Sequence, residues 1–449
     1  MKPRALPTVA RMRPFVPPSF ERARLSNGLD VVVAEKAGLP VIDVQLVVRG
    51  GAAVDPPALA GRASLTAELL DEGSLHRSAL EISDCIEQLG AHLDLQVSWD
   101  ACALTVHGLV PRLAAMLDLL AEVALEPAFP AHEFTRKKEE RLHRLQQERA
   151  EPRVVASKAL ARAVFGAQQS YGCPLSGSTA TIAQLGRESL VDSYTNHFAP
   201  ARAHLIVVGP IDAQRIMSEL EQRFGAWSAV PGAQPRVQGA PPRTRTIYLI
   251  DRPGAAQSEV RVGHVGLPRN TPDYFPALIM NTVLGGSFKS RLNMILRAEK
   301  GFTYGAGSSF SFRREGGLFS SGAAVFTHNT AESVAIFVRE LARLRQDGVR
   351  TDEIERSRRY HALGFARAFE TTRDITEQLA ELALYDLDET QLQTYTDRIA
   401  SVDQSDIERV ARQCLRPEEL SIVVVGDRVR VLEPLRQLEL GPILEWEAE

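Results

Sequence analysis

Cysteine is scarce in this sequence of 449 residues, and long hydrophobic runs are absent. The four cysteines have no regular spacing and form no CxxC pair, which argues against a zinc ribbon and against a disulfide framework. Buried free thiols are the better interpretation. No apolar run approaches the roughly 18 residues that a transmembrane helix needs, so we expect no membrane span.

A basic excess is absent as well. The formal net charge is −4, whereas a nucleic-acid-binding domain usually carries an excess of positive charge, so we expect no nucleic-acid partner. The first 20 residues include basic side chains but no continuous hydrophobic region, and they do not resemble a signal peptide. With the free thiols, this favours a cytoplasmic protein. A periplasmic protein whose signal peptide had been removed would look the same.

Common catalytic motifs are also missing. The ten histidines form no HxxEH, HExxH or HxH pair, and there is no Walker loop, no nucleotide-binding GxGxxG and no GxSxG elbow. Glu140 and His143 lie three positions apart in a predicted helix, as two metal ligands would. Because the sequence has no second such pair, a solvated helix face is the better interpretation of these two residues.

The length and the distribution of proline indicate two large domains. Residues 1–20 contain five prolines and read as an extended arm. Residues 228–245 are rich in proline, glycine and small side chains, which is typical of a linker. We therefore predict an N-terminal domain over 21–227 and a C-terminal domain over 246–449.

The two predicted domains look like repeats of each other. The segment HLIVVGPIDAQRIMSELEQRFG (residues 204–225) parallels LSIVVVGDRVRVLEPLRQLELG (residues 420–441). The helices that begin near His132 and Asp352 have almost the same offset, and a period of roughly 220 residues indicates a duplicated domain. Runs of strands and runs of helices predict an α+β fold, with a largely antiparallel sheet covered by helices on one side in each half.

Chemistry is most concentrated in GGSFKSRLNMILRAEKGFTYG (residues 285–305). The pattern predicts an amphipathic helix that ends at Gly301, followed by a strand over 305–312. Arg297 at the helix end and Tyr304 seven residues later are positioned to reach a common point. From the pattern alone, Arg297 is equally explained as a cation at a helix C-terminus, and Tyr304 as a half-buried strand aromatic.

AGRASLTAELLDEGS (residues 60–74) resembles the zinc-site helix of the pitrilysin/insulinase family, the peptidases with an inverted HxxEH motif. The small residue and glycine before the helix match, as do the glycine and hydroxyl residue after it. In this register Ser64 and Glu68 take the two histidine positions, Ala67 takes that of the general base, and Arg144 takes that of the third ligand. Such side chains cannot hold a zinc ion and its catalytic water, so the resemblance implies no cofactor in this chain.

Two more segments resemble the same family. FGAQQSYGCPLSGS (residues 165–178) is similar to the segment that follows the third ligand, and SRLNMILRAEKGFTYGAGSSF (residues 290–310) is similar to the second-domain signature. In that signature an arginine and a tyrosine face the zinc site, and their positions here are Arg297 and Tyr304. The order and spacing of the motifs extend the resemblance over nearly the whole chain.

The resemblance implies a metal-free subunit of a heterodimeric peptidase, similar to the non-zinc subunit of mitochondrial processing peptidase. A homologous partner bearing HxxEH would supply the zinc and the general base, and the substrate would be an extended peptide that adds as a strand to a sheet edge. Arg297 and Tyr304 would bind the substrate carbonyl and stabilise the negative charge of the transition state. This chain alone is expected to be inactive.

Three expectations concern neighbouring residues and other functions. Gly285, Gly286 and Ser287 correspond to a substrate-handling loop of the family, or Ser287 caps the following helix. Glu68 and Arg144 are expected to form an ion pair in the vacated metal site, or each faces solvent. The alternatives to a peptidase subunit are a structural subunit like the family's core proteins in respiratory complexes, and a homodimeric protein that holds peptides without cutting them.

Overall fold

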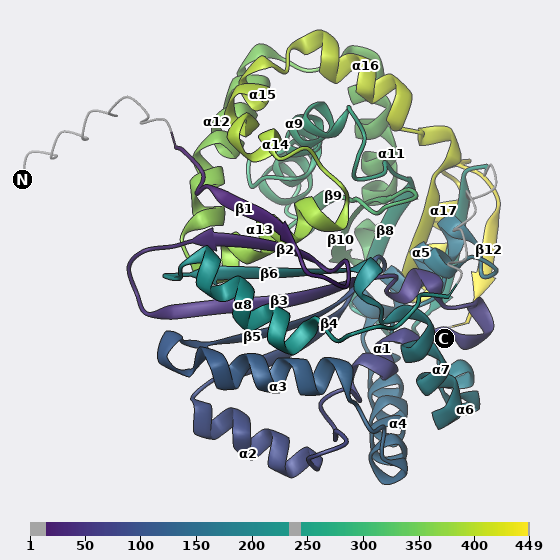
Figure 1. Ribbon diagram of the computed structural model, residues 1–449. Coiled ribbons are helices and arrows are strands. Elements are labelled where there is room, and N and C mark those ends of the chain that lie inside the picture. The colour runs from purple at the N-terminus through teal and green to yellow at the C-terminus, as the bar shows by residue number, and fades with distance from the viewer. Residues whose placement is uncertain (1–14, 233–243, 448–449) are drawn as a thin grey trace, which may run out of the picture.

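A computed structural model describes residues 15–232 and 244–447 of the chain (Figure 1). Most of the predicted arm (1–14) and of the predicted linker (233–243) lies outside these residues. In the described ranges the chain forms two six-stranded sheets surrounded by helices. No helix in this part of the chain is long and apolar enough to cross a membrane.

The first sheet has the strand order β1-β2-β6-β3-β5-β4. Its strands are Phe20–Arg24 (β1), Asp30–Glu35 (β2), Val41–Arg49 (β3), His92–Val97 (β4), Ala101–Leu109 (β5) and Ala203–Gly209 (β6). Neighbouring strands are antiparallel except for β2 and β6, which run parallel with Val31 opposite Leu205. Every residue of β6 is buried, as expected for a central strand whose two faces are both covered.

The second sheet repeats this arrangement in the order β12-β7-β11-β8-β10-β9. Its strands are Thr246–Asp251 (β7), Gln257–Val265 (β8), Gly307–Ser311 (β9), Leu318–Phe326 (β10), Ser421–Gly426 (β11) and Ile443–Trp446 (β12). The parallel pair β7–β11, with Ile247 opposite Ile422, takes the place of β2–β6. The edges differ, because β12 runs parallel to β7 whereas β1 runs antiparallel to β2. The predicted α+β fold with two similar halves is confirmed.

The helices of the first half are Arg62–Ala67 (α1), Ala79–Leu89 (α2), Leu113–Leu125 (α3), Ala131–Glu148 (α4), Pro152–Phe165 (α5), Thr179–Gln184 (α6), Arg187–His197 (α7) and Ala213–Phe224 (α8). Those of the second half are Tyr274–Leu284 (α9), Arg291–Asn293 (α10), Thr330–Asp347 (α11), Thr351–Phe365 (α12), Thr372–Leu384 (α13), Thr390–Gln393 (α14), Tyr395–Ser401 (α15), Gln404–Cys414 (α16) and Arg428–Arg436 (α17). Pro152 is the first residue of α5, where a missing N–H costs nothing.

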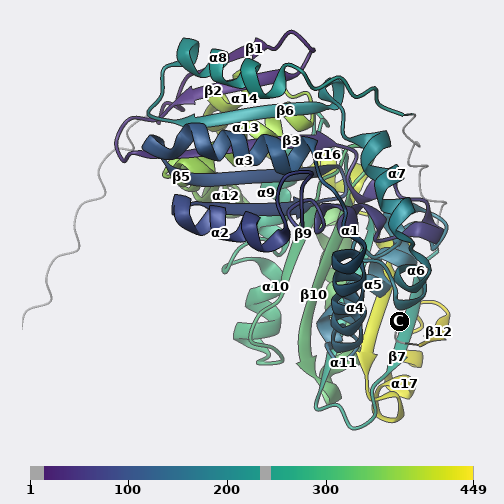
Figure 2. The same ribbon diagram turned by 60° about the horizontal axis from the view of Figure 1, so that its bottom comes forward.

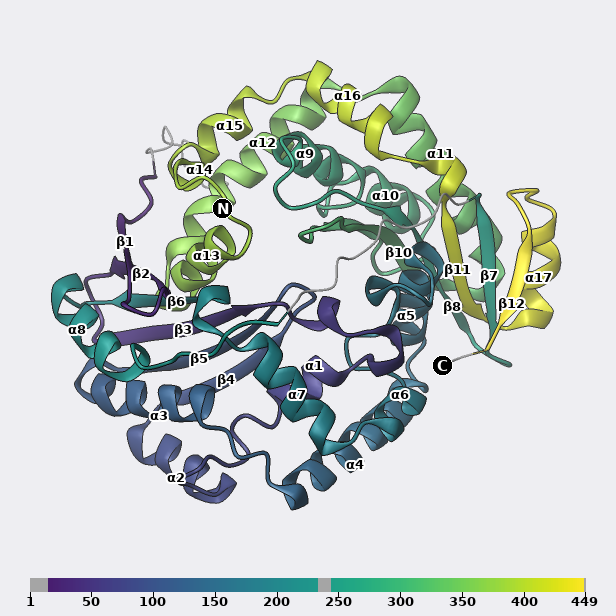
Figure 3. The same ribbon diagram turned by 45° about the vertical axis from the view of Figure 1, so that its right-hand side comes forward.

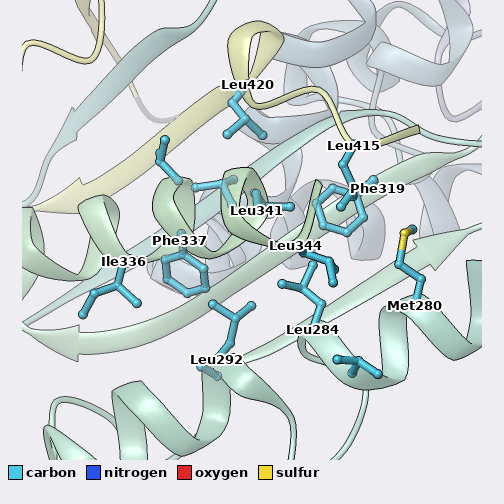
Figure 4. Close-up of a cluster of buried hydrophobic side chains, with 14 of the residues drawn as sticks. Met280, Leu284, Leu292, Phe319, Ile336, Phe337, Leu341, Leu344, Leu415 and Leu420 are labelled. Atoms are coloured by element: carbon cyan, nitrogen blue, oxygen red, sulfur yellow. The ribbon is translucent and has the colours of Figure 1, made fainter. Parts of the chain in front are cut away.

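Each sheet packs one face against helices of its own half, as predicted. In the second half, side chains of α9, α11 and the segment around α16 meet the sheet in a core that includes Met280, Phe319, Phe337 and Leu341 (Figure 4). The equivalent core of the first half forms between its sheet and helices such as α3 and α8. Helices of the same half thus cover one face of each sheet.

The other face of each sheet is covered by a helix from the opposite half, an exchange that the sequence does not predict. Helix α5 packs on β8 and β11 of the second sheet, and α13 packs on β3 and β6 of the first (Figure 3). Leu160 of α5 joins a buried cluster with Tyr248 and Val423. Leu379 of α13 joins another with Ile206. Each half therefore completes the core of the other.

Buried polar contacts hold the two halves together at the same junction. The Asp100 carboxylate accepts hydrogen bonds from the hydroxyls of Tyr171 (3.1 Å) and of Tyr385 (2.9 Å), which belong to opposite halves. The guanidinium of Arg313 lies over the Trp99 ring, with its central carbon 4.4 Å from the ring centroid. Burial lowers the pKa of Arg313 to about 10. These contacts fix the orientation of the second sheet relative to the first.

Candidate functional site

The segment that carries Arg297 and Tyr304 lies at the β9 edge of the second sheet, the edge opposite β12, where α10 stands beside β10 (Figure 2). The predicted amphipathic helix is instead the short α10 followed by a π-helix, Met294–Glu299. Its wider turn is closed by the N–H of Lys300, which donates to the Ile295 carbonyl at 3.0 Å. Buried Leu296 fixes this turn to the core. Single π turns recur at functional sites, and this one contains Arg297.

Gly301 ends the helical segment in the predicted left-handed conformation, with φ at +66°. The chain then reaches β9 through a turn that three hydrogen bonds fix. The Thr303 hydroxyl oxygen donates to the Gly305 carbonyl (3.0 Å) and accepts from the Gly305 N–H (3.1 Å), and the Ala306 N–H donates to Asn293 Oδ1 (3.2 Å). The backbone on either side of Tyr304 is therefore held in place while the side chain is not.

Arg297 is half-buried, and an aromatic ring rather than a carboxylate contacts its guanidinium. The central carbon lies 4.3 Å from the ring centroid of Phe288, a cation–π contact. Phe288 itself is 68% exposed. Among residues 15–232 and 244–447, no carboxylate lies within ion-pair distance of Arg297, whereas nearby Lys300 pairs with Glu332 at 2.7 Å. The positive charge of Arg297 is thus oriented without being neutralised.

Tyr304 is 90% exposed. The half-buried strand aromatic considered from the sequence is therefore wrong, and so is the strand start at 305, since β9 begins at Gly307. Within the described residues the phenolic hydroxyl has no hydrogen-bond partner. Tyr304 borders a cleft of about 620 Å³ above the second sheet. Arg297 does not line this cleft, so the structure places the two residues on one segment without bringing them into contact. Their joint action on a substrate stays a prediction.

Gly285 and Gly286 pack closely against β9 and α9. A Cβ on Gly285 would lie 2.4 Å from the Ser308 backbone nitrogen, and one on Gly286 would lie 2.6 Å from Asn281 Nδ2. Ser287 donates its hydroxyl to the Thr282 carbonyl at 3.1 Å. It does not cap the following helix, because α10 starts at Arg291 with Ser290 in the cap position. Close packing explains the two glycines, and a substrate role for residues 285–287 stays a prediction.

The helix that resembles a zinc site is α1, and charged side chains fill its vacated position. Arg144 Nη1 lies 3.2 Å from Glu68 Oε1, which confirms the predicted ion pair. Arg141 Nη2 lies closer to the same oxygen, at 2.7 Å, and Arg141 is buried. Sequence reasoning missed Arg141, although it precedes Arg144 by three positions and so shares its helix face. Two guanidinium groups around one carboxylate do not form a donor set for zinc.

Other side chains on and near α1 also fail to form a set of zinc ligands. Ser64 and Ala67 are buried and supply no imidazole or carboxylate. Burial raises the pKa of the Asp71 carboxyl to about 6. Glu140, the candidate metal ligand beside His143, pairs with Arg136 at 2.7 Å on the surface of α4. In the described parts of the chain, no three His, Cys, Asp or Glu side chains converge as metal ligands.

The unequal burial of the two arginines leads to a prediction about stability. Arg141→Ala is expected to lower the free energy of unfolding by about 2 kcal/mol, because it removes a buried ion pair and the hydrogen bond to the Ser176 carbonyl. Arg144→Ala is expected to cost less than about 1 kcal/mol, because Arg144 is largely exposed. Urea unfolding of the two variants measures the difference, and equal losses would contradict the assignment of Arg141 as the main partner of Glu68.

Comparison with known proteins agrees with this geometry. Residues 30–176 match the family described as Insulinase (Peptidase family M16), and residues 184–360 match the Peptidase M16 inactive domain. A protein of Streptomyces coelicolor named as an uncharacterized zinc protease is 24% identical over 90% of this chain and 89% of its own length. One of Bacillus subtilis with the same designation is 22% identical over 76% of this chain and 82% of its own length.

Solved structures show the same fold. A peptidase M16 inactive domain from Pseudomonas fluorescens superposes with a TM-score of 0.85 at 22% identity, covering 91% of this chain and 98% of its own. A protease from Helicobacter pylori superposes with a TM-score of 0.84 at 18% identity, covering 91% of this chain and 100% of its own. The chain therefore belongs to the M16 (insulinase) family of peptidases, which confirms the predicted family.

Proposed function

We propose that this chain is the metal-free subunit of a two-chain M16 peptidase, and that a homologous HxxEH-bearing subunit supplies the zinc. The observation that carries the proposal is the state of Arg297. It bears a positive charge without a carboxylate partner in the described residues, it is held by the Phe288 ring, and it shares a segment with exposed Tyr304. The replaced metal site around Glu68 explains why a partner is needed.

Peptide hydrolysis places negative charge on the scissile carbonyl oxygen, and fixed hydrogen-bond donors lower that barrier. The Arg297 guanidinium has N–H groups in a fixed plane, and the Tyr304 phenol can donate one O–H. In the complex both would donate to this oxygen, and the partner's zinc would supply the activated water. Within the described residues the Tyr304 phenol makes no hydrogen bond, so none has to break before it donates to the substrate.

The experiment that tests the proposal is reconstitution. The chain alone is expected to cleave no peptide, and a mixture with an HxxEH-bearing relative is expected to cleave a fluorogenic peptide library. Cleavage by the chain alone would overturn the assignment. So would a cleavage rate of the mixture that is unchanged when Arg297 is substituted. A peptide-binding protein without catalysis is the second candidate, which the cleft beside Tyr304 favours; it predicts binding but no turnover with any relative.

Phe288 provides a more detailed test of how Arg297 is oriented. Phe288→Leu in the reconstituted complex is expected to lower kcat/KM by about two- to fivefold, the size of an exposed cation–π contact. Phe288→Trp is expected to restore activity, because the indole face binds cations at least as well. Phe326→Leu, which removes an exposed ring that stacks on His328, is the matched control and is expected to have no effect. Equal activity of the leucine and tryptophan variants at position 288 would show that the ring does not act through its face.

A further inference from the structure

The cleft beside Tyr304 has walls from both halves of the chain. Its floor is the part of the α5-bearing face of β8, β9 and β10 that α5 does not cover, and its rim includes Arg153 and Ser157 from the first turns of α5. Because α5 belongs to the first half and the sheet to the second, the exchange of helices creates this cleft. Its volume of about 620 Å³ accommodates a peptide segment.

Small and polar residues line the cleft. Glycines and alanines occur at 305–307 and 322–324, and the Ser309 and Ser320 hydroxyls lie 3.2 Å apart. At Gly322 a Cβ would lie 2.3 Å from the Val260 carbonyl oxygen and 2.4 Å from Arg261 Nη1, so glycine leaves room for the Arg261 side chain to cross the strand there. No large aliphatic side chain faces the cleft among the residues that line it. Such a surface suits a polar or charged side chain better than a bulky apolar one.

The charges in the cleft do not balance. Glu259, which is 6% exposed, forms an ion pair with Arg261. Burial raises the pKa of the Glu259 carboxyl, against the opposing effect of Arg261 and Arg153. Arg153 is exposed, and no carboxylate of the described residues lies within ion-pair distance of it. With one pair neutralised, the cleft keeps the positive charge of Arg153.

We propose that this cleft is a substrate subsite for an acidic side chain, and that Arg153 selects it. The ligand class is a peptide that carries Asp or Glu at the position next to Tyr304, with the carboxylate paired to the Arg153 guanidinium. The inference rests on the proposed function, since it names the substrate class of the same site. Arg153 acts on specificity and is not assigned a part in bond cleavage.

The test uses the reconstituted complex and a peptide series with Glu, Gln or Lys scanned along one sequence. At the peptide position that lies in the cleft, kcat/KM of the wild type is expected to be about fivefold higher for Glu than for Gln, the effect of a well-formed exposed ion pair. Arg153→Glu is expected to reverse the preference toward Lys at that position. Arg149→Glu is the control: Arg149 is also exposed, lies just before α5 and is outside the cleft, so it should leave the preference unchanged.

Fluorescence anisotropy with labelled peptides separates failure of this inference from failure of the proposed function. Turnover that depends on Arg297 but treats the Glu, Gln and Lys peptides alike would overturn the acidic subsite and leave the peptidase role intact. Absence of turnover with an Arg153-dependent preference in Kd would overturn the peptidase role and leave the subsite intact. An unchanged preference in Arg153→Glu would overturn the assignment of Arg153 in either assay.

Discussion

Arg297→Ala in the reconstituted two-chain complex is expected to lower kcat by about two to three orders of magnitude, as loss of an oxyanion donor does in other hydrolases. The expected loss is large because no carboxylate of the described residues competes for the guanidinium, so its charge is available to the substrate. Since the contact forms fully only in the transition state, KM should change less than kcat. Tyr304→Phe is expected to have a smaller effect, because it removes one neutral donor.

Steady-state kinetics on the complex, with assembly checked by size-exclusion chromatography, measure this effect. Lys289→Ala is the matched control, because it removes an exposed positive charge next to Phe288 without touching the proposed donors. Its kcat should equal that of the wild type. Full activity of Arg297→Ala, or a loss of activity explained by failed assembly, would refute the catalytic role.

Division of the chain between residues 233 and 243 is expected to leave neither half folded on its own. The first half would lose α13 and expose the sheet face that includes Val32, Val47 and Ile206. The second half would lose α5 and expose the face that includes Tyr248 and Val423. Exposure of apolar faces of this kind promotes aggregation. Co-expressed halves should assemble, because each then regains its missing helix.

Solubility and circular dichroism of the separate and co-expressed halves test this expectation, and a cooperatively unfolding first half alone would contradict it. Point variants of the intact chain test the packing of α13 on the first sheet without dividing the chain. Leu379→Ala, on the buried face of α13, is expected to cost about 2–5 kcal/mol of unfolding free energy. Leu363→Ala, on α12 and 57% exposed, is the control and should change it by less than about 0.5 kcal/mol.

Local patterns predicted the fold class, because most strands and helices have a clear period. The repeat seen between residues 204–225 and 420–441, for example, corresponds to the strand–helix pairs β6–α8 and β11–α17. The exchange of α5 and α13 was not predictable in this way, because a pattern shows that a helix has an apolar face but not which sheet it covers. Short β12 was missed, because four residues that end in tryptophan carry little periodic signal.

The site was predicted unevenly. The Glu68–Arg144 pair followed from the family resemblance, and Gly301 from its place after a helix. The π-helix was missed because the apolar positions at Leu292 and Leu296 have the same spacing as in an α-helix. Phe288 was missed because its contact with Arg297 crosses a turn. A phenylalanine beside a lysine in a glycine-rich turn gives no sign that an arginine will stack on it.

The exchanged helices give the chain the organisation of a domain-swapped dimer whose two copies have been fused. In a symmetric ancestor built from two identical chains, α5 and α13 would be the same helix, exchanged between the copies so that both faces of each sheet are covered. In such a symmetric ancestor the cleft would have occurred twice. In a single chain that holds both halves, the two copies of every position are independent, so that one can change without the other. Such independence allows the second half to carry the Arg297–Tyr304 segment while the first half carries the ion pairs around Glu68.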